Sequence, residues 1–388
     1  MVSDSRRCAP DLWATLLGSA RPQGSRDAMT TNTRLKKTVR ARMSRTGESY
    51  TAARAKIMGH AAATFGVLHV TNGDSAASSL QEALSTDVLP WRDVLNAGPV
   101  PSLPPAQLRL VRARFLAQRY GRRVGDVAAE LRQRDRALLA HRGRYLLWFD
   151  PDLYDQLQLI QILTALRRNS VGAGSISLIN PGEMIGHAHF AGLGELPPAA
   201  LADLLPYSVT LVPETLELAG RAWSAFQSTN PTGMVAIAST ADPRLRFLGE
   251  AFGRLLQEYP SVSDGLSLTE RRALLAVADR ARTARAAFRW VSERERRPFL
   301  GDVQFLDTLA DLAAGEKPLL ALSPQAPRPS GSTEVVLTET GRRVLASRGR
   351  YTGVDYWIGG VHLAPGLPSW RYDDRLETLV RTGGKNAT

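Results

Sequence analysis

The first half of the chain alternates short apolar runs with longer amphipathic stretches. The apolar runs VLHV, RYLLWF and SISLIN have the length of buried strands, and a short extended piece, DVLPWRD, follows the first of them. The stretches between the runs place apolar residues at helical spacing, as in Ala76, Ala77 and Leu80. Strands that alternate with helices in this way form parallel sheets covered by helices. We therefore predict one α/β domain over residues 64–212, with a doubly wound, mainly parallel sheet.

From residue 213 onward the pattern is mostly helical. The sequence SLTE predicts a capping box, in which Ser267 begins a helix and Glu270 bonds back to it. Two further helices follow, then two short strands around a Pro/Ser-rich loop, and then the helix LTETGRRVLA. Helices followed by a two-stranded ribbon are typical of a winged-helix module. We predict an α-helical region with a winged-helix-like module over residues 213–350, and a docking tail with a disordered end over 351–388.

The net charge of +12 is concentrated in two segments. Residues 1–60 hold twelve basic and four acidic residues, and residues 109–144 hold eleven basic and three acidic ones, so the rest of the chain is mildly acidic. We expect residues 1–33 to be a disordered leader and residues 34–63 a basic helical segment. Such a segment can bind the phosphates of a nucleic acid, and the alternative is a solvated, partly helical tail.

The cysteine count and the hydropathy limit where the protein works. Cys8 is the single cysteine, which excludes an internal disulfide and a cysteine-based zinc site. The apolar runs are all shorter than the roughly 20 residues that cross a bilayer. Pro10 and Asp11 interrupt the short apolar patch near the N-terminus, so a signal peptide is not favoured. These features predict a cytoplasmic protein with no membrane partner.

Three segments in a fixed order carry a family resemblance. They are LHVTNGDSAASSLQEAL, continuing to LPWRDVLNAGPVP; LLWFDPDLYDQLQLIQIL; and the tail with LTETGRRVLA, YWIGGVHL and WRYD. With these segments the chain resembles the uncharacterised bacterial domain of unknown function 1835 family over about residues 66–373. The resemblance implies an α/β N-terminal domain, a helical C-terminal part and no established activity. The family pattern has His-Glu where Asn96-Ala97 stand and Glu-His where Asp150-Pro151 stand, so this chain lacks those histidines.

Polar residues follow each predicted strand of the α/β domain. Because the carboxyl ends of parallel strands lie at one edge of a sheet, these residues are expected to form one ligand-facing rim. The rim residues are Asn72, Gly73, Asp74 and Ser75 after the first strand, Trp91, Arg92 and Asp93 after the second, Asp150, Asp152, Tyr154 and Asp155 after the third, and Asn180 and Glu183 after the fourth.

Two ligand chemistries fit this rim. Helix N-termini with glycine and serine favour a phosphate or another anion. Carboxylates suit a magnesium ion, since hard divalent cations take oxygen ligands, and Asp74, Asp150 and Asp152 are the candidate metal ligands. The alternative interpretation is that Asp74, Asp152 and Asp155 only cap helices.

Other chemistries are disfavoured by single residues. The sequence around Ser75 is Gly-Asp-Ser-Ala, without the leucine and the late Asp-x-x-His pair of the Gly-Asp-Ser-Leu esterases, and a serine without a base is a poor nucleophile. Gly73 is the only glycine of the first strand turn, so a dinucleotide fingerprint is missing. His187 and His189, near Glu183, are more typical of a surface loop than of a metal site.

Three functions remain open on the sequence. The first is a non-catalytic or regulatory binding protein, with an anion or nucleotide-type ligand at the rim and a winged-helix module that contacts a protein or nucleic acid. The second is a magnesium-dependent enzyme of phosphoryl transfer or nucleic-acid cleavage. The third is a purely structural protein-interaction module. The predicted recognition helix, GDVQFLDTLADLAA, carries only acidic charges, which argues against insertion into a DNA groove.

Overall fold

The computed structural model describes residues 66–182, 192–324, 328–353, 355–365 and 369–382, together with Arg40, Arg42 and Met43. The predicted leader, nearly all of the basic segment, Cys8, and the group of Glu183, His187 and His189 lie outside the described residues.

The chain divides into two compact units that are not contiguous in sequence. The first unit comprises Met1–Arg92, Gln133–Phe149 and Val171–Val212, and the second comprises Asp93–Arg132, Asp150–Ser170 and Pro213–Thr388. The last boundary, at Val212, coincides with the expected end of the α/β domain. Two segments inside that domain nevertheless belong to the second unit, which the simple division at residue 212 did not anticipate.

The first unit is built on a five-stranded sheet. Its strands are β1 (Val67–Asn72), β2 (Val88–Trp91), β3 (Arg144–Trp148), β4 (Ile176–Ile179) and β5 (Val209–Thr210). Their order is β2-β1-β3-β4-β5; the first four are parallel, and β5 is antiparallel to β4. The predicted mixed α/β class and the mainly parallel sheet are confirmed. The two-residue strand β5 was not predicted, because its residues are too few and too exposed to give a hydrophobic pattern.

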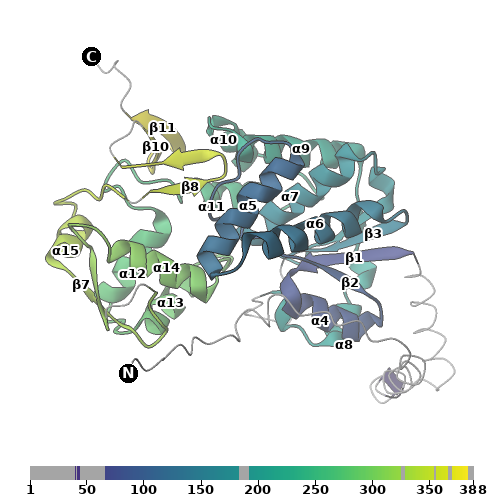
Figure 1. Ribbon diagram of the computed structural model, residues 1–388, viewed down its shortest axis with the longest axis horizontal. Coiled ribbons are helices and arrows are strands. Elements are labelled where there is room, and N and C mark those ends of the chain that lie inside the picture. The colour runs from purple at the N-terminus through teal and green to yellow at the C-terminus, as the bar shows by residue number, and fades with distance from the viewer. Residues whose placement is uncertain are drawn as a thin grey trace, which may run out of the picture. The chain divides into compact units, whose positions relative to one another are not determined.

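A helix layer covers one face of this sheet within the first unit. It contains α4 (Gly73–Leu84) and α8 (Pro198–Ala202), which lie side by side next to β1 and β2 in Figure 1. Leu80 of α4, Trp148 of β3 and Leu201 of α8 are buried in one apolar cluster. The unit also holds the short 3-10 turns η1 (Ala173–Ser175), η2 (Leu193–Glu195) and η3 (Leu205–Tyr207).

A fully buried histidine lies in the middle of β1. His69 has no exposed surface, and the indole Nε1 of Trp148 donates a hydrogen bond to its Nδ1 at 3.1 Å. The Nε2 of His69 is buried without a hydrogen-bond partner. Burial lowers the pKa of His69 to about 4, so its ring is neutral in the folded protein.

Acid is therefore expected to destabilise the first unit through His69. The pKa of His69 is lower in the folded than in the unfolded chain, so its contribution is complete above pH 6.5 and is lost as the pH falls towards 4. The full loss amounts to about 3 kcal/mol. His69→Gln keeps an acceptor for Trp148 and removes the titration. The decrease in melting temperature between pH 7.5 and 4.5 should be smaller in this variant, and an unchanged decrease would refute the role of His69.

The second unit contains the helices α5 (Pro105–Tyr120), α7 (Leu153–Arg168), α9 (Pro213–Gln227), α10 (Thr232–Ala238) and α11 (Leu248–Leu256). Helices α9 and α11 pack against α7, and α10 packs against α9 and α11. The α6 helix (Val124–Ala140) starts in the second unit and ends in the first. Eleven of the sixteen residues of α7 are buried, so the helix is covered on most sides. Its main partner within the unit is α9, where Thr164 donates to the carbonyl oxygen of Ala219 at 3.4 Å.

Residues 266–345 form a helical subdomain with one core. Its elements are α12 (Leu268–Ala278), α13 (Ala284–Ser292), α14 (Asp302–Leu312), β6 (Leu320–Ser323), β7 (Glu334–Leu337) and α15 (Glu339–Leu345). Buried side chains from all six elements meet in a single apolar cluster. The predicted capping box is confirmed: the Glu270 amide donates to Ser267 Oγ at 3.1 Å, and the Ser267 amide donates to Glu270 Oε2 at 2.7 Å. The strands β6 and β7 are antiparallel, and Thr283 forms a further bridge to Glu334.

The tail forms two ribbons, β8–β9 (Tyr356–Ile358, Val361–Leu363) and β10–β11 (Ser369–Asp373, Thr378–Thr382). Backbone hydrogen bonds attach both ribbons to the second unit. The amide of Gly360 donates to the Phe226 carbonyl at 2.9 Å, and the amide of Tyr372 donates to the Pro260 carbonyl at 3.0 Å. The ribbons were not predicted from the sequence, since their strands are only three to five residues long.

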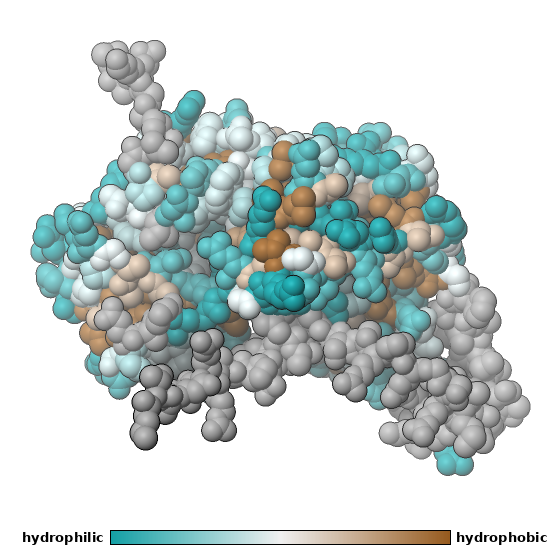
Figure 2. Space-filling view, viewed as in Figure 1, coloured by the Kyte–Doolittle hydropathy of each residue, from teal (hydrophilic) through white to brown (hydrophobic). Residues whose placement is uncertain are grey.

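In the part of the chain that the structure describes, no helix combines the length and the apolar character needed to cross a membrane. Hydrophobic residues on the face shown in Figure 2 occur as separate patches among hydrophilic ones.

Candidate functional site

The rim residues of the first unit are held by interactions within that unit. Asp74, in the first turn of α4, forms an ion pair with Arg92, whose Nε lies 3.0 Å from Asp74 Oδ1. The hydroxyl of Ser75 donates to the carbonyl oxygen of Gly194 at 3.2 Å. Trp91 is only 2% exposed, and the guanidinium carbon of Arg134 lies 3.7 Å from the centre of its ring. Asp74 and Arg92 thus neutralise each other, and Trp91 is covered.

Asp93 belongs to a buried ion pair of the second unit. Arg112 Nη2 lies 2.7 Å from Asp93 Oδ1, and both side chains are 1% exposed. Arg112 also donates to the carbonyl oxygens of Val94 at 2.7 Å, Ala97 at 2.8 Å and Pro99 at 3.2 Å. The pair therefore fixes the loop 94–99, and Asp93 is inaccessible to a ligand.

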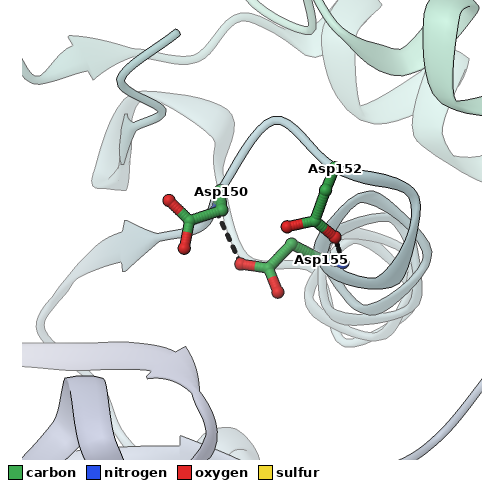
Figure 3. Close-up of side chains that lie close together, drawn as sticks. All are labelled: Asp150, Asp152 and Asp155. Carbon is green, nitrogen blue, oxygen red and sulfur yellow. Dashed lines mark hydrogen bonds between the residues drawn. The ribbon is translucent and has the colours of Figure 1, made fainter. Parts of the chain in front are cut away.

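Three carboxylates come together after β3, at the start of α7 (Figure 3). Asp150, Asp152 and Asp155 each offer an oxygen within 4.8 Å of the other two. Asp152 is the N-cap of α7 and accepts the Asp155 amide at 3.1 Å, while the Asp155 carboxylate accepts the Asp150 amide at 2.6 Å. Gln156 adds a bond from its Nε2 to the Asp150 carbonyl at 2.8 Å. Two of the three carboxylates thus satisfy amides at a helix start.

Burial changes the acidity of this group. It raises the pKa of Asp152 to about 6, against the opposing effects of amide hydrogen bonds from Asp155 and Tyr154. Burial also raises the pKa of Tyr154 well above its usual value, and the charges of Asp93, Asp152 and Asp155 add to that effect. Tyr154 is therefore a neutral phenol, and Asp152 titrates close to neutral pH.

The structure brings together only two of the three predicted magnesium ligands. Asp150 and Asp152 belong to the carboxylate group, whose third member is Asp155. Asp74 is not a member of that group and is paired with Arg92. Among the other rim residues, Asn72 ends β1, Gly73 adopts a φ of +67° at the strand-to-helix turn, and Asn180 donates to the Phe149 carbonyl at 2.5 Å.

The arginine-rich window 109–144 is partly neutralised by the protein itself. Within the second unit, Arg112 pairs with Asp93, Arg119 with Asp307 and Arg122 with Glu130. In the first unit, Arg134 pairs with Asp135 at 2.8 Å. Four of the eleven arginines in this stretch are therefore neutralised by acidic residues of the protein, which weakens the stretch as a nucleic-acid-binding surface.

A cavity of about 670 Å³ opens within the second unit. Its wall is formed by the loop 94–99, α5, the start of α12, the two residues Phe299 and Leu300 before α14, α14 and β8. The lining residues are Asn96, Ala97, Gly98, Pro99, Val111, Arg114, Phe115, Gln118, Arg119, Glu258, Ser267, Thr269, Glu270, Phe299, Leu300, Gln304, Asp307, Thr308, Asp311, Asp355, Tyr356 and Trp357.

The acidic residues of this wall fall into two groups. Glu258 and Asp307 form ion pairs with Arg254 and Arg119, so their charges are balanced within the unit. The carboxylate of Asp355 lies 2.6 Å from Nε2 of His362, at hydrogen-bond distance. Glu270 and Asp311 form no ion pair with any of the described residues.

The environment of the second group favours its protonated forms. Burial raises the pKa of Glu270 to about 7, and the neighbouring charges of Glu258 and Asp311 add to the rise. Burial and the charge of Asp307 raise the pKa of Asp311 to about 6, against the effect of Arg119. Carboxylic acids with pKa values near neutrality in a cavity are typical of ligand sites.

This cavity could not be predicted from the sequence, because its wall comes from segments up to about 260 residues apart. Each segment by itself looks like ordinary helix or loop. One signal was present: Asn96-Ala97, noted as a departure from the family pattern, lies in the wall, and Asn96 Oδ1 accepts a hydrogen bond from Gln304 at 3.2 Å.

Comparison with known proteins does not identify a family for this chain. No protein-family model matches the chain, and no curated protein matches it significantly. The resemblance to the domain of unknown function 1835 family therefore stays a prediction.

Proposed function

We propose that the protein is a non-catalytic or regulatory binding protein that holds a small molecule in the cavity of the second unit. The cavity itself is the observation that carries this proposal. Its volume of about 670 Å³ is in the range of small-molecule sites, roughly 300–1,000 Å³. Its wall combines aromatic surface from Phe115, Phe299 and Trp357 with polar groups, as such sites do.

We further propose that residues 266–345 are a winged-helix-like module. Three helices followed by an antiparallel ribbon, with the bridge between Thr283 and Glu334, support this assignment. In that order α14 takes the place of the recognition helix. Gln304 and Asp307 of α14 contact Asn96 and Arg119 of the same unit. The outer face of α14 is therefore acidic and is partly covered by the protein itself. A partner protein suits the module better than DNA. Because α14 also lines the cavity, a bound ligand would act on the contact module directly.

The strand order β2-β1-β3-β4 supports a doubly wound assignment for the sheet, with its order reversal between β1 and β3. An anion or nucleotide at the rim is the second place for a ligand in this proposal. It has less support than the cavity, since Asp74 and Ser75 are bound internally and Asp93 is buried. Binding of nucleic acid by residues 34–63 rests on their charge alone.

A screen with a blocked cavity tests the proposed function. Thr308→Trp places a large side chain in the wall, and Ala321→Trp places the same side chain on an exposed position of β6 outside it. We expect compounds from a fragment library to raise the melting temperature of the wild type and of Ala321→Trp but not of Thr308→Trp. Stabilisation that is equal in all three proteins would place the ligand elsewhere, and a screen without any stabilising compound would contradict the proposal.

The three carboxylates of Figure 3 support one rival, a magnesium-dependent enzyme. If that rival holds, magnesium or manganese raises the melting temperature of the wild type and not of Asp150→Ala. Our account assigns Asp152 and Asp155 to the start of α7, so we expect no metal-dependent change in either protein, and a loss of about 1 kcal/mol of stability in Asp152→Ala.

A further inference from the structure

The cavity is lined by four aromatic side chains, namely Phe115, Phe299, Tyr356 and Trp357. The class of ligand, which rests on the proposed function of the cavity, depends on which of these rings has a face left for it. Phe115 packs against Gly98, where an added Cβ would lie 2.5 Å from the ring, and the guanidinium carbon of Arg112 lies 4.9 Å from the ring centre. Phe299 is 8% exposed, and the guanidinium carbon of Arg254 lies 5.0 Å from its ring centre. Both phenyl rings are therefore engaged by the protein itself.

The two rings of β8 are arranged differently. Tyr356 is anchored by its hydroxyl, which donates to the carbonyl oxygen of Glu258 at 3.2 Å. Successive residues of a strand point to opposite faces, so Trp357 extends from the other face of the ribbon. Its indole is half-buried and lines the cavity, which leaves apolar ring surface for a ligand to cover.

A histidine covers one face of the Trp357 indole. His362 of β9 is the cross-strand partner of Trp357, and the two rings are nearly parallel, with centroids 4.6 Å apart and an angle of 12° between their planes. Trp357 is one of the lining residues of the cavity, whereas His362 is not. The imidazole therefore lies on the side of the indole that faces away from the cavity, and the opposite face borders the cavity.

The histidine is itself held in place. The carboxylate of Asp355 lies 2.6 Å from Nε2 of His362, at hydrogen-bond distance. The ribbon that carries both rings is attached to α9 through the bond from the Gly360 amide to the Phe226 carbonyl. The indole is thus backed and oriented before a ligand arrives, and such preorganisation lowers the entropic cost of binding.

A flat aromatic ring is the group that this surface favours. Two aromatic rings prefer an offset-stacked arrangement and gain affinity beyond the burial of apolar area, a gain that a saturated ring of the same size does not make. We propose that the cavity binds a planar aromatic ligand that stacks on the face of Trp357 opposite His362, with His362 as a positioning residue for the indole. Polar side chains of the wall, such as Gln118 and Thr308, then bind the substituents of that ring.

Two bicyclic alcohols with the same skeleton test the assignment. The compound 2-naphthol is planar and aromatic, whereas decahydro-2-naphthol is saturated and puckered. Calorimetric titrations near pH 7 give the ratio of the two affinities for each protein. We expect the preference for 2-naphthol to be about three- to tenfold larger in the wild type than in Trp357→Leu, the effect of one aromatic pair. Trp357→Phe, which keeps a ring, should retain most of the preference.

Two further variants separate stacking from a general effect on the ribbon. His362→Ala removes the ring behind the indole and should lower the preference about twofold, and an unchanged preference in this variant would contradict the positioning role. Trp370→Leu, on β10 and outside the cavity, is the matched control and should leave the preference unchanged.

The same affinity ratio in the wild type and in Trp357→Leu overturns the stacking assignment. If Thr308→Trp nevertheless abolishes the binding of both alcohols, the cavity remains the ligand site although the aromatic assignment fails. If 2-naphthol, indole and quinoline all fail to bind the wild type, the aromatic assignment is wrong, and the fragment screen then decides the proposed function separately.

Discussion

Replacing Arg112 by methionine is expected to lower the free energy of unfolding of the second unit by about 3–5 kcal/mol, the cost of breaking a buried ion pair from one side. Asp93 would remain buried without its counter-ion, at a position where both side chains are 1% exposed. Three carbonyl oxygens of the loop 94–99 would lose their donors as well. Urea unfolding, with hydrogen exchange of α5 and α9 as the probe, measures the loss.

The matched control lies two residues along the same helix. Arg114 is exposed, so Arg114→Met should change the stability by no more than about 0.5 kcal/mol. The double variant Arg112→Met with Asp93→Leu should recover part of the loss, because it removes both charges. A single variant as stable as the control would mean that the pair does not hold the loop. Since Asn96 to Pro99 line the cavity, Arg112→Met should also weaken any ligand that binds there.

A methyl group at Gly360 is expected to release the β8–β9 ribbon. A Cβ at this residue would lie 1.9 Å from the carbonyl oxygen of Gln227, which is backbone and cannot move aside cheaply. The Gly360 amide is bonded to the Phe226 carbonyl, so the ribbon and the end of α9 would have to separate. We expect Gly360→Ala to cost about 3 kcal/mol, the upper part of the range for overpacking.

Gly253→Ala is the control for that substitution. Gly253 lies inside α11, where an added Cβ meets nothing within 4 Å, so alanine should leave the stability unchanged or raise it by up to about 1 kcal/mol. Hydrogen exchange of the β8–β9 amides should rise in Gly360→Ala alone. If these amides stay as protected as in the wild type, the ribbon is not held by the close approach. Tyr356 and Trp357 of β8 line the cavity, so a released ribbon should also reduce ligand affinity.

Local patterns predicted the elements well. The apolar runs around Val70, Leu147 and Leu178 lie in parallel strands, and SLTE does begin α12 with both bonds of a capping box. These features depend on neighbours in the sequence, so periodicity and capping residues indicate them directly.

Local sequence patterns could not predict how the chain divides into two units, because each unit combines segments that are distant in sequence. Periodicity indicates that α7 has apolar faces, but not that α9, which begins 45 residues after the end of α7, covers one of them. The same limit applies to charge. Asp74 has the residue type and the position of a metal ligand, and only the structure shows that Arg92 neutralises it. Asp152 could be read as a ligand or as a cap, and its bond to the Asp155 amide shows that it caps α7.

The cavity is the least predictable feature, because it depends on how distant segments pack. Glu270 was expected as a capping residue and is one, yet its carboxylate also borders the cavity. Asp311 counted only as an acidic charge on the predicted recognition helix. A sequence indicates the chemistry of each residue but not which residues from α5, α12, α14 and β8 share one space.

A crystal structure of the protein with a stabilising compound from the screen is the most direct measurement. The account predicts electron density for that compound in the cavity, against the side chains of Phe115, Phe299 or Trp357. Density at another surface, or a cavity closed by its own side chains while the compound still binds, would contradict it.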